Sequence, residues 1–296
     1  LTELYSLIQL SLFNTTSNPR VVVGQEGWLF YNNYDADDNP VSDLLGQNEF
    51  TEEDIQKIRE NISAAQDACP EAQFILLIVP NKENIYKEKL PVYLLEEAVE
   101  KTRVDLLCER LCREFDCLVY PKAALEEASL SWQTYYKYDT HWNLLGGYIG
   151  FREACAAADA ELPALELLEV SFTDDEYPKD LAALAGIQNR VSDDSEISIK
   201  GFNADVEVSC EDLGGGVSLF RSNAADERSV LFVHDSFYKS MEPWMPLVFS
   251  EVISVDRDYY DLYGCHSLID EYSPDIILME VAERGAILLL HEDMPY

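Results

Sequence analysis

The sequence predicts an α/β protein built on a mainly parallel sheet, with helices packed on both faces of that sheet. Residues 73–79, 230–233 and 275–281 are continuous apolar runs of strand length, the pattern of strands buried on both faces. Segments with helical spacing lie between them, and strands that alternate with helices form parallel sheets through right-handed connections. The chain has 296 residues, of which 47% are hydrophobic, and this is enough for a substantial core.

The first half of the chain shows its elements clearly. The apolar spacing of residues 1–15 predicts a short lead-in helix, and two β-rich runs within 21–31, separated by a glycine-containing turn, predict a hairpin. Thr51, followed by acidic residues, predicts a helix that starts there and reaches about residue 67. After the strand at 73–79 we expect a helix over 95–115, a strand over 117–120 and a helix over 143–158.

The second half has a region without a clear pattern, followed by a regular one. Residues 160–228 have mixed polarity, and the sequence does not order their elements. After the strand at 230–233 we expect a helix over 237–249, a strand over 252–255, a helix near 262–272 and a strand over 275–281. We therefore expect a single domain over residues 19–296.

The start of the chain suggests a trimmed N-terminus. Its first residues, LTELY, are neither an initiator nor a signal peptide, and no apolar run is long enough to span a bilayer. We expect residues 1–18 to be a lead-in helix and the remnant of an anchor region, with the anchor or export signal itself outside this sequence.

The composition narrows the classes of partner and cofactor. A formal net charge of −35 repels phosphate backbones and anionic lipid, which argues against nucleic-acid binding and against a polyanionic glycan. The seven cysteines contain no CxxC pair, and with only four histidines a metal site is not expected. We expect most of the cysteines to be buried free thiols, and the pattern leaves one disulfide open.

Ser236 stands where α/β proteins build their sites. It follows the strand at 230–233 and precedes a helix, so its hydroxyl should lie at the carboxyl end of a parallel sheet. Its backbone N–H would then lie at a helix N-terminus, which suits a developing oxyanion. The alternative is that Asp235 and Ser236 only cap the helix.

Asp139 and His141 supply the other parts of a nucleophilic serine site. A serine needs an imidazole to take its proton, and the imidazole needs a carboxylate that fixes its tautomer. An Asp-x-His pair can direct both groups at one partner. His234 is the second candidate for the base, because it lies two residues before Ser236 but lacks such a carboxylate.

An ordered set of motifs resembles a known family. The chain is similar to the SGNH-hydrolase-like domain of the alginate O-acetyltransferases, of the AlgX and AlgJ type, and to the related DHHW proteins. The resemblance covers roughly residues 20–285 and rests on segments 27–31 (GWLFY), 79–82 (VPNK), 85–86 (IY), 90–91 (LP), 139–143 (DTHWN), 180–181 (DL) and 234–237 (HDSF). It implies a three-layer αβα, flavodoxin-like fold in which the Asp-x-His element precedes the serine element.

Carried over by position, the resemblance implies roles for particular residues. Ser236 would be the nucleophile, His141 the general base and Asp139 its orienter, with the Ser236 N–H and Asn81 as oxyanion donors. Family members usually have glycine where this chain has His234. The remaining candidates for substrate binding are Lys82, Tyr86, Trp142, Arg284 and His234 itself.

These observations predict a serine-dependent O-acetyltransferase that acts on an extracytoplasmic polysaccharide or cell-wall glycan through an acetyl-serine intermediate. No metal and no cofactor are expected. The resemblance implies a glycan acceptor and a membrane-bound partner protein that delivers the acetyl group, and hence a cell-surface or membrane-anchored location. Two alternatives stay open: a carbohydrate esterase with the same triad, and a non-enzymatic glycan-binding or envelope-assembly protein.

Overall fold

In the computed structural model the described residues are 7, 10, 13, 15–173, 177, 179–191, 196–257 and 265–291. The predicted lead-in helix lies mostly outside them. No helix within these ranges is long and apolar enough to cross a bilayer. The six cysteines whose side chains are described are all unbridged, and Cys210 is the exposed one among them.

The centre of the fold is a seven-stranded, mainly parallel sheet, as predicted. Its order is β4-β3-β11-β9-β10-β8-β7, and the first five of these strands run parallel, while β8 and β7 are antiparallel additions at one edge. The strands are β3 (Gln73–Val79), β4 (Leu118–Val119), β7 (Val208–Gly214), β8 (Val217–Ser222), β9 (Asp226–His234), β10 (Phe249–Asp256) and β11 (Ile276–Ala282).

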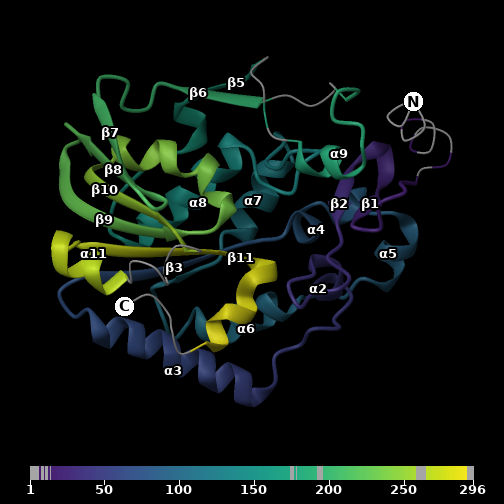
Figure 1. The fold of residues 1–296 in the computed structure, drawn as a ribbon, viewed down its shortest axis with the longest axis horizontal. Helices are drawn as coiled ribbons and strands as arrows, with labels where there is room; N and C mark the ends of the chain where they lie inside the picture. Colours follow the sequence, from purple (N-terminus) through teal and green to yellow (C-terminus); the bar gives the residue numbers. More distant parts are fainter. Residues whose placement is uncertain are drawn as a thin grey trace.

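Helices cover both faces of this sheet, which gives three layers (Figure 1). Successive residues of β3 alternate between two apolar cores, because side chains of a strand point to opposite faces. One core contains α7 (Lys122–Ser129) and α8 (Leu144–Ala157), and the other contains α3 (Glu52–Ala68), α6 (Arg103–Leu111), α11 (Cys265–Tyr272) and the 3₁₀ segment η7 (Glu283–Leu290).

Smaller elements surround the carboxyl ends of the parallel strands. The predicted hairpin is present as β1 (Val21–Val23) and β2 (Leu29–Tyr31), and the region without a pattern contributes a second two-stranded sheet, β5 (Glu169–Thr173) with β6 (Glu196–Lys200). Short helices complete this side: α2 (Pro40–Leu44), α4 (Lys82–Ile85), α5 (Val92–Glu97) and α9 (Asp180–Leu184).

Two predicted helices are wrong in their extent. The helix expected over 95–115 is two helices, because the side chain of Thr102 caps a new start at α6 in a reciprocal capping box with Asp105. The helix expected over 237–249 is a pair of 3₁₀ segments, η4 (Ser236–Ser240) and η5 (Glu242–Leu247). Pro243 and Pro246 lack the N–H groups that an α-helix would use there.

A close approach of α8 to η4 brings the two halves of the site together. A Cβ atom at Gly147 would lie 2.1 Å from the carbonyl oxygen of Ser240, so only glycine permits this contact. The indole N–H of Trp142 donates to the carbonyl oxygen of Phe237 at 2.8 Å, and the Ser240 hydroxyl donates to the carbonyl oxygen of Trp142 at 3.1 Å. These contacts fix the segment that follows Ser236 against the segment that contains His141.

Candidate active site

Ser236 is exposed and is the first residue of η4, directly after the turn at Asp235 that follows β9. The capping role falls to Asp235, whose Oδ1 accepts the Phe237 N–H at 2.9 Å. The other oxygen of Asp235 accepts the Ala282 N–H on β11 at 2.8 Å. Ser236 itself caps nothing, and within the described part of the chain neither its hydroxyl nor its N–H is used to hold the turn.

His141 connects Ser236 to Asp139. Its Nε2 lies 2.9 Å from Ser236 Oγ, and its Nδ1 lies 2.6 Å from Asp139 Oδ1. The side chain of His141 is 22% exposed and that of Asp139 is fully buried, so burial increases from the serine inward. With Nδ1–H donating to the carboxylate, Nε2 presents its lone pair to the serine hydroxyl, which is the tautomer a general base requires.

Three donors converge on the Asp139 carboxylate. Besides the His141 ring, the backbone N–H of His141 donates to Oδ1 at 3.0 Å, and the backbone N–H of Asp180 donates to Oδ2 at 2.7 Å. Burial alone would raise the pKa of Asp139, but these hydrogen bonds and the charge of His141 lower it to about 2. The carboxylate is therefore ionised at neutral pH and can stabilise a protonated imidazole.

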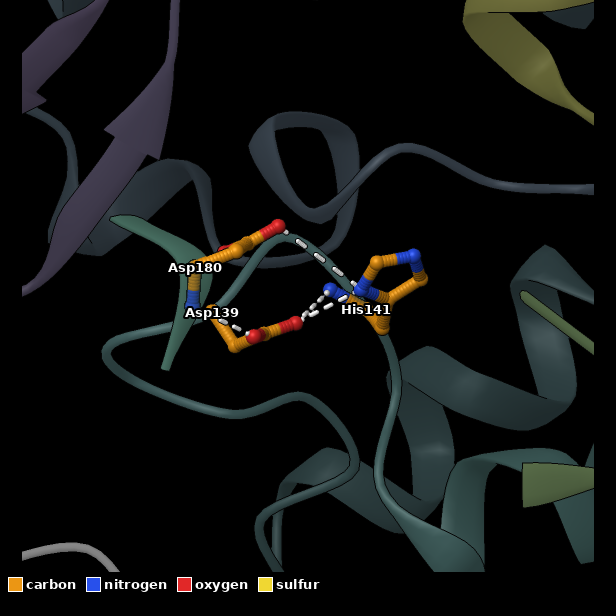
Figure 2. Close-up of side chains that lie close together, drawn as sticks. All are labelled: Asp139, His141 and Asp180. Atoms are coloured by element: carbon orange, nitrogen blue, oxygen red, sulfur yellow. Dashed lines mark hydrogen bonds and ion pairs between the residues drawn. The ribbon is translucent and has the colours of Figure 1, made fainter. Parts of the chain in front are cut away.

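Asp180 is a site residue that the sequence reasoning missed. Its Oδ2 accepts the Thr140 hydroxyl at 2.6 Å and lies 3.8 Å from His141 Nδ1, so both carboxylates are directed at the same ring nitrogen (Figure 2). Burial and the nearby charge of Asp139 raise the pKa of Asp180. The available signal was the segment 180–181 of the family resemblance, but it lies in a region whose elements the sequence did not order.

The same three side chains, Asp139, His141 and Asp180, are close enough to be considered as metal ligands, with ligand atoms within 4.8 Å of one another. The 2.6 Å between Nδ1 and Asp139 Oδ1 is a hydrogen-bond distance. The oxygens of both carboxylates also accept N–H and O–H donors of the protein. Hydrogen bonding thus accounts for this arrangement.

His234, the second candidate for the base, points away from the serine. Its ring is buried, its Nε2 lies 2.9 Å from Ser254 Oγ and its Nδ1 lies 3.1 Å from the carbonyl oxygen of Asp235. The ring also stacks on Tyr238 with centroids 3.9 Å apart. Burial lowers the pKa of His234 to about 4. The side chain is part of the packing beneath the turn and makes no contact with the serine hydroxyl.

The expectation of substrate contact does not hold for four further residues, whose side chains are almost completely buried. They are Asn81, Lys82, Tyr86 and Trp142. Asn81 accepts the Arg284 N–H through Oδ1, and its own N–H donates to the Glu283 carboxylate. Lys82 donates to the carbonyl oxygens of Asp139 and Tyr136 at 2.6 and 3.2 Å, and the Tyr86 hydroxyl accepts the Thr134 N–H. These side chains support the site from behind.

Arg284 is the predicted binding residue that reaches open space. It lines a cavity of about 180 Å³ together with Ser236, Asp235, Asp256, Arg257, Asp38, Ala282 and Gly285. A second cavity of about 350 Å³ contains His141 and is lined in addition by Tyr136, Lys179, Asp180, Gln188, Phe237, Lys239, Asp139, Ala183 and Ser240. Ser236 is the residue that both cavities share.

Comparisons with known proteins agree with this architecture. The family model described as "SGNH hydrolase-like domain, acetyltransferase AlgX" matches residues 21–201, which include Asp139 and His141 but end before Ser236. The "Probable alginate O-acetylase AlgJ" of Pseudomonas putida is 25% identical over 163 residues. That match covers 54% of this chain and 39% of the relative, so this chain spans well under half of that protein's length.

Two solved structures share the fold along nearly the whole chain. A DHHW family protein from Eubacterium siraeum superposes with a TM-score of 0.65 at 14% identity, covering 94% of each chain. The O-acetyltransferase domain of Pseudomonas putida AlgJ superposes with a TM-score of 0.53 at 16% identity, covering 92% of this chain and 93% of that one. Since the family model matches more than half of the sequence, the chain belongs to the family of SGNH hydrolase-like acetyltransferase domains of the AlgX type.

Proposed function

We propose that this protein is a serine-dependent O-acetyltransferase that acts on an extracytoplasmic polysaccharide or cell-wall glycan through an acetyl-Ser236 intermediate. The observation that carries the proposal is the contact of His141 with both exposed Ser236 and buried Asp139, at 2.9 and 2.6 Å. Membership of an acetyltransferase family and the O-acetylase activity in the name of the AlgJ relative support the choice of an acetyl group and of a glycan acceptor.

In the first half of the reaction, Ser236 Oγ attacks the carbonyl carbon of an acetyl ester while its proton moves to His141 Nε2. The carbonyl π electrons move to the oxygen, which becomes an oxyanion, and Asp139 stabilises the protonated imidazole. When the oxyanion collapses, the bond to the leaving alcohol breaks, and His141 returns its proton to that alcohol. The products are acetyl-Ser236 and the free alcohol.

In the second half, a sugar hydroxyl takes the place of the leaving alcohol. It loses its proton to His141 Nε2 as its oxygen attacks the acetyl carbon, and the new oxyanion then expels Ser236 Oγ, which regains the proton from the imidazole. The acceptor therefore has to enter the cavity that contains His141. This cycle requires no metal and no cofactor.

The partners follow from the charge of the chain and from its family. A net charge of −35 disfavours a polyuronate acceptor, so we propose a neutral or cell-wall glycan, although the relative AlgJ is described as a "Probable alginate O-acetylase". We also propose that a membrane-bound partner protein delivers the acetyl group and that the reaction takes place outside the cytoplasm at the cell surface. The same acidic surface disfavours nucleic acid.

The mechanism is tested by trapping the acetyl-enzyme. Wild type and Ser236→Ala are incubated with p-nitrophenyl acetate and their intact masses are measured. We expect one added acetyl group on wild type and none on Ser236→Ala. Ser131→Ala, which removes an exposed serine from another surface of the molecule, is the matched control and should be acetylated as wild type is. Equal acetylation of Ser236→Ala and wild type would rule out this nucleophile.

Hydrolysis is the second candidate activity, because Ser236 is exposed and water can reach its acyl-enzyme. The two activities are separated by the products formed from p-nitrophenyl acetate with and without an acceptor oligosaccharide such as chitotetraose. Acetylated oligosaccharide identifies a transferase. Free acetate as the sole acetyl-containing product beside p-nitrophenol, formed at a rate that the acceptor does not change, identifies an esterase.

A further inference from the structure

The two cavities beside Ser236 must hold different parts of the substrate during an acyl transfer. The leaving alcohol takes a proton from His141 Nε2, and the accepting hydroxyl gives its proton to the same nitrogen, so both occupy the cavity that contains His141. The carbonyl oxygen must point away from the imidazole, because it gathers negative charge while the imidazole nitrogen handles the proton. The cavity on the other side of Ser236 is therefore the one available to the acyl oxygen.

Arg284 presents an unused guanidinium to that cavity. Its Cζ lies 5.2 Å from the ring centroid of Phe237 and 5.8 Å from that of Tyr31, so two aromatic rings hold it. Its backbone N–H donates to Asn81 Oδ1 at 3.2 Å, which fixes the main chain at this position. Among the described residues, the guanidinium has no hydrogen-bonding acceptor, so its N–H groups are available to a ligand.

Arg257 is the second guanidinium in the lining. Its side chain is 29% exposed, and its Nη1 is buried without a hydrogen-bond partner in the described part of the chain. This Nη1 lies 3.9 Å from Asp235 Oδ2, which is beyond hydrogen-bonding distance, and that oxygen already accepts the Ala282 N–H. Charge attraction thus holds the arginine, while its Nη1 donor has no hydrogen-bond acceptor among the described residues.

The lining also contains three carboxylates, which limit the net charge of the cavity. Both oxygens of Asp235 are engaged by backbone N–H groups, and Asp38 accepts the side-chain amide of Asn33 at 2.5 Å. Asp256 is the third. The cavity therefore offers directed N–H donors close to the nucleophile and has no strong positive field, which suits a transient oxyanion better than a polyanion.

We propose that this cavity is an oxyanion subsite for the acyl group, in which Arg284, Arg257 and the Ser236 N–H receive the carbonyl oxygen as it becomes negative. The subsite rests on the acyl-transfer function proposed above and specifies where its charge develops. Arginine suits this role because its planar fork keeps its charge at all pH values and presents several donors at once. The volume of about 180 Å³ fits a short acyl group such as acetyl.

The test measures the rate constant of Ser236 acetylation by p-nitrophenyl acetate in Arg284→Gln and Arg257→Gln. Loss of one oxyanion donor slows the chemical step about 10²-fold. We expect the acetylation rate constant of each variant to decrease by that order, with only a small change in the p-nitrophenyl acetate concentration that gives half of the maximal rate. Affinity for methylboronic acid, which forms a tetrahedral anionic adduct with a nucleophilic serine, should fall in parallel. Arg221→Gln removes an exposed arginine that pairs with Glu251 on β10, and it should behave as wild type.

The outcomes distinguish the subsite from the proposed function. Acetylation of both arginine variants at the Arg221→Gln rate would overturn the subsite and leave the nucleophile intact. If wild type takes up no acetyl group, the proposed function fails. The subsite is then tested by acetate binding to wild type, measured as broadening of the acetate NMR signal. Acetate binding that either arginine variant abolishes would support an anion site, whereas binding unaffected by both would overturn it.

Discussion

Replacement of Asp139 by asparagine tests the core of the mechanism with the smallest change of shape. The wild-type carboxylate accepts three N–H groups, two on Oδ1 and one on Oδ2. An asparagine offers one acceptor and one donor. If its NH₂ group takes the Oδ2 position it faces the Asp180 N–H, and if it takes the Oδ1 position it faces two donors of His141. In the second case the proton of the His141 ring moves from Nδ1 to Nε2, and Nε2 can then no longer accept the proton of Ser236.

The expected magnitudes follow from the same contacts. The corresponding change in the serine protease triad lowers kcat about 10⁴-fold, and we expect acetylation of Ser236 to slow by about 10³- to 10⁴-fold. The pKa of Asp139 falls from 3.8 to about 2, which at 1.36 kcal/mol per unit means about 2 kcal/mol of stability. Because the folded pKa is depressed, this stability is present above pH 3.8 and is lost as the pH falls through about 2.

The assay combines burst kinetics on p-nitrophenyl acetate with urea unfolding at pH 7. Asp54→Asn is the matched control, because it changes a carboxylate in the capping box of α3, far from the site, and should cost about 1 kcal/mol without slowing acetylation. A stably folded Asp139→Asn variant that is acetylated within about threefold of the wild-type rate would refute the assigned role. Such a change is far smaller than the decrease in rate expected when His141 adopts the wrong tautomer.

Two further predictions concern stability. His234 has a folded pKa of about 4 against an ordinary value of 6.5, so the folded protein binds this proton less readily than the unfolded chain does. The free energy of unfolding therefore falls as the pH drops from 6.5 to 4, and between pH 7 and 5 the loss is about 2 kcal/mol. Urea unfolding at both pH values should show a smaller loss in His234→Gln, and an equal loss would contradict the assignment. Gly147→Ala places Cβ 2.1 Å from the Ser240 carbonyl oxygen and should destabilise by more than about 3 kcal/mol and slow acetylation. Gly285→Ala, with 3.4 Å to its nearest atom, is the control for stability alone and should unfold as wild type does. Thermal unfolding of both variants checks this, and equal melting temperatures would show that the close approach is not needed.

The order of strands and helices could be predicted well because it depends on local patterns. The apolar run at 73–79 is typical of a strand buried on both faces of a parallel sheet, and Thr51 caps its helix with groups three residues apart. The helix at 95–115 was overextended because apolar spacing continues across the cap at Thr102. The segment 237–249 was predicted as an α-helix although two prolines stand inside it.

The candidate site was only partly predictable. The residue types and their placement at a strand end and before a helix pointed to Ser236, His141 and Asp139, and the family resemblance gave their order. Asp180 was missed, since its contact with Asp139 joins segments 41 residues apart through a backbone N–H, which any residue possesses. Lys82 was expected in the cleft, but its ammonium is buried against backbone carbonyl oxygens.

The sequence by itself determined the sheet, the helices on its two faces and the chemical groups of a nucleophilic serine site, because apolar periodicity, caps and residue types act locally. Only the tertiary structure decided that His141 and Ser236, 95 residues apart, lie in hydrogen-bonding contact, that His234 points inward and that two arginines flank the serine. Side-chain direction depends on what packs against each element, and the close approach of α8 to the turn after β9 is made by residues from distant parts of the chain.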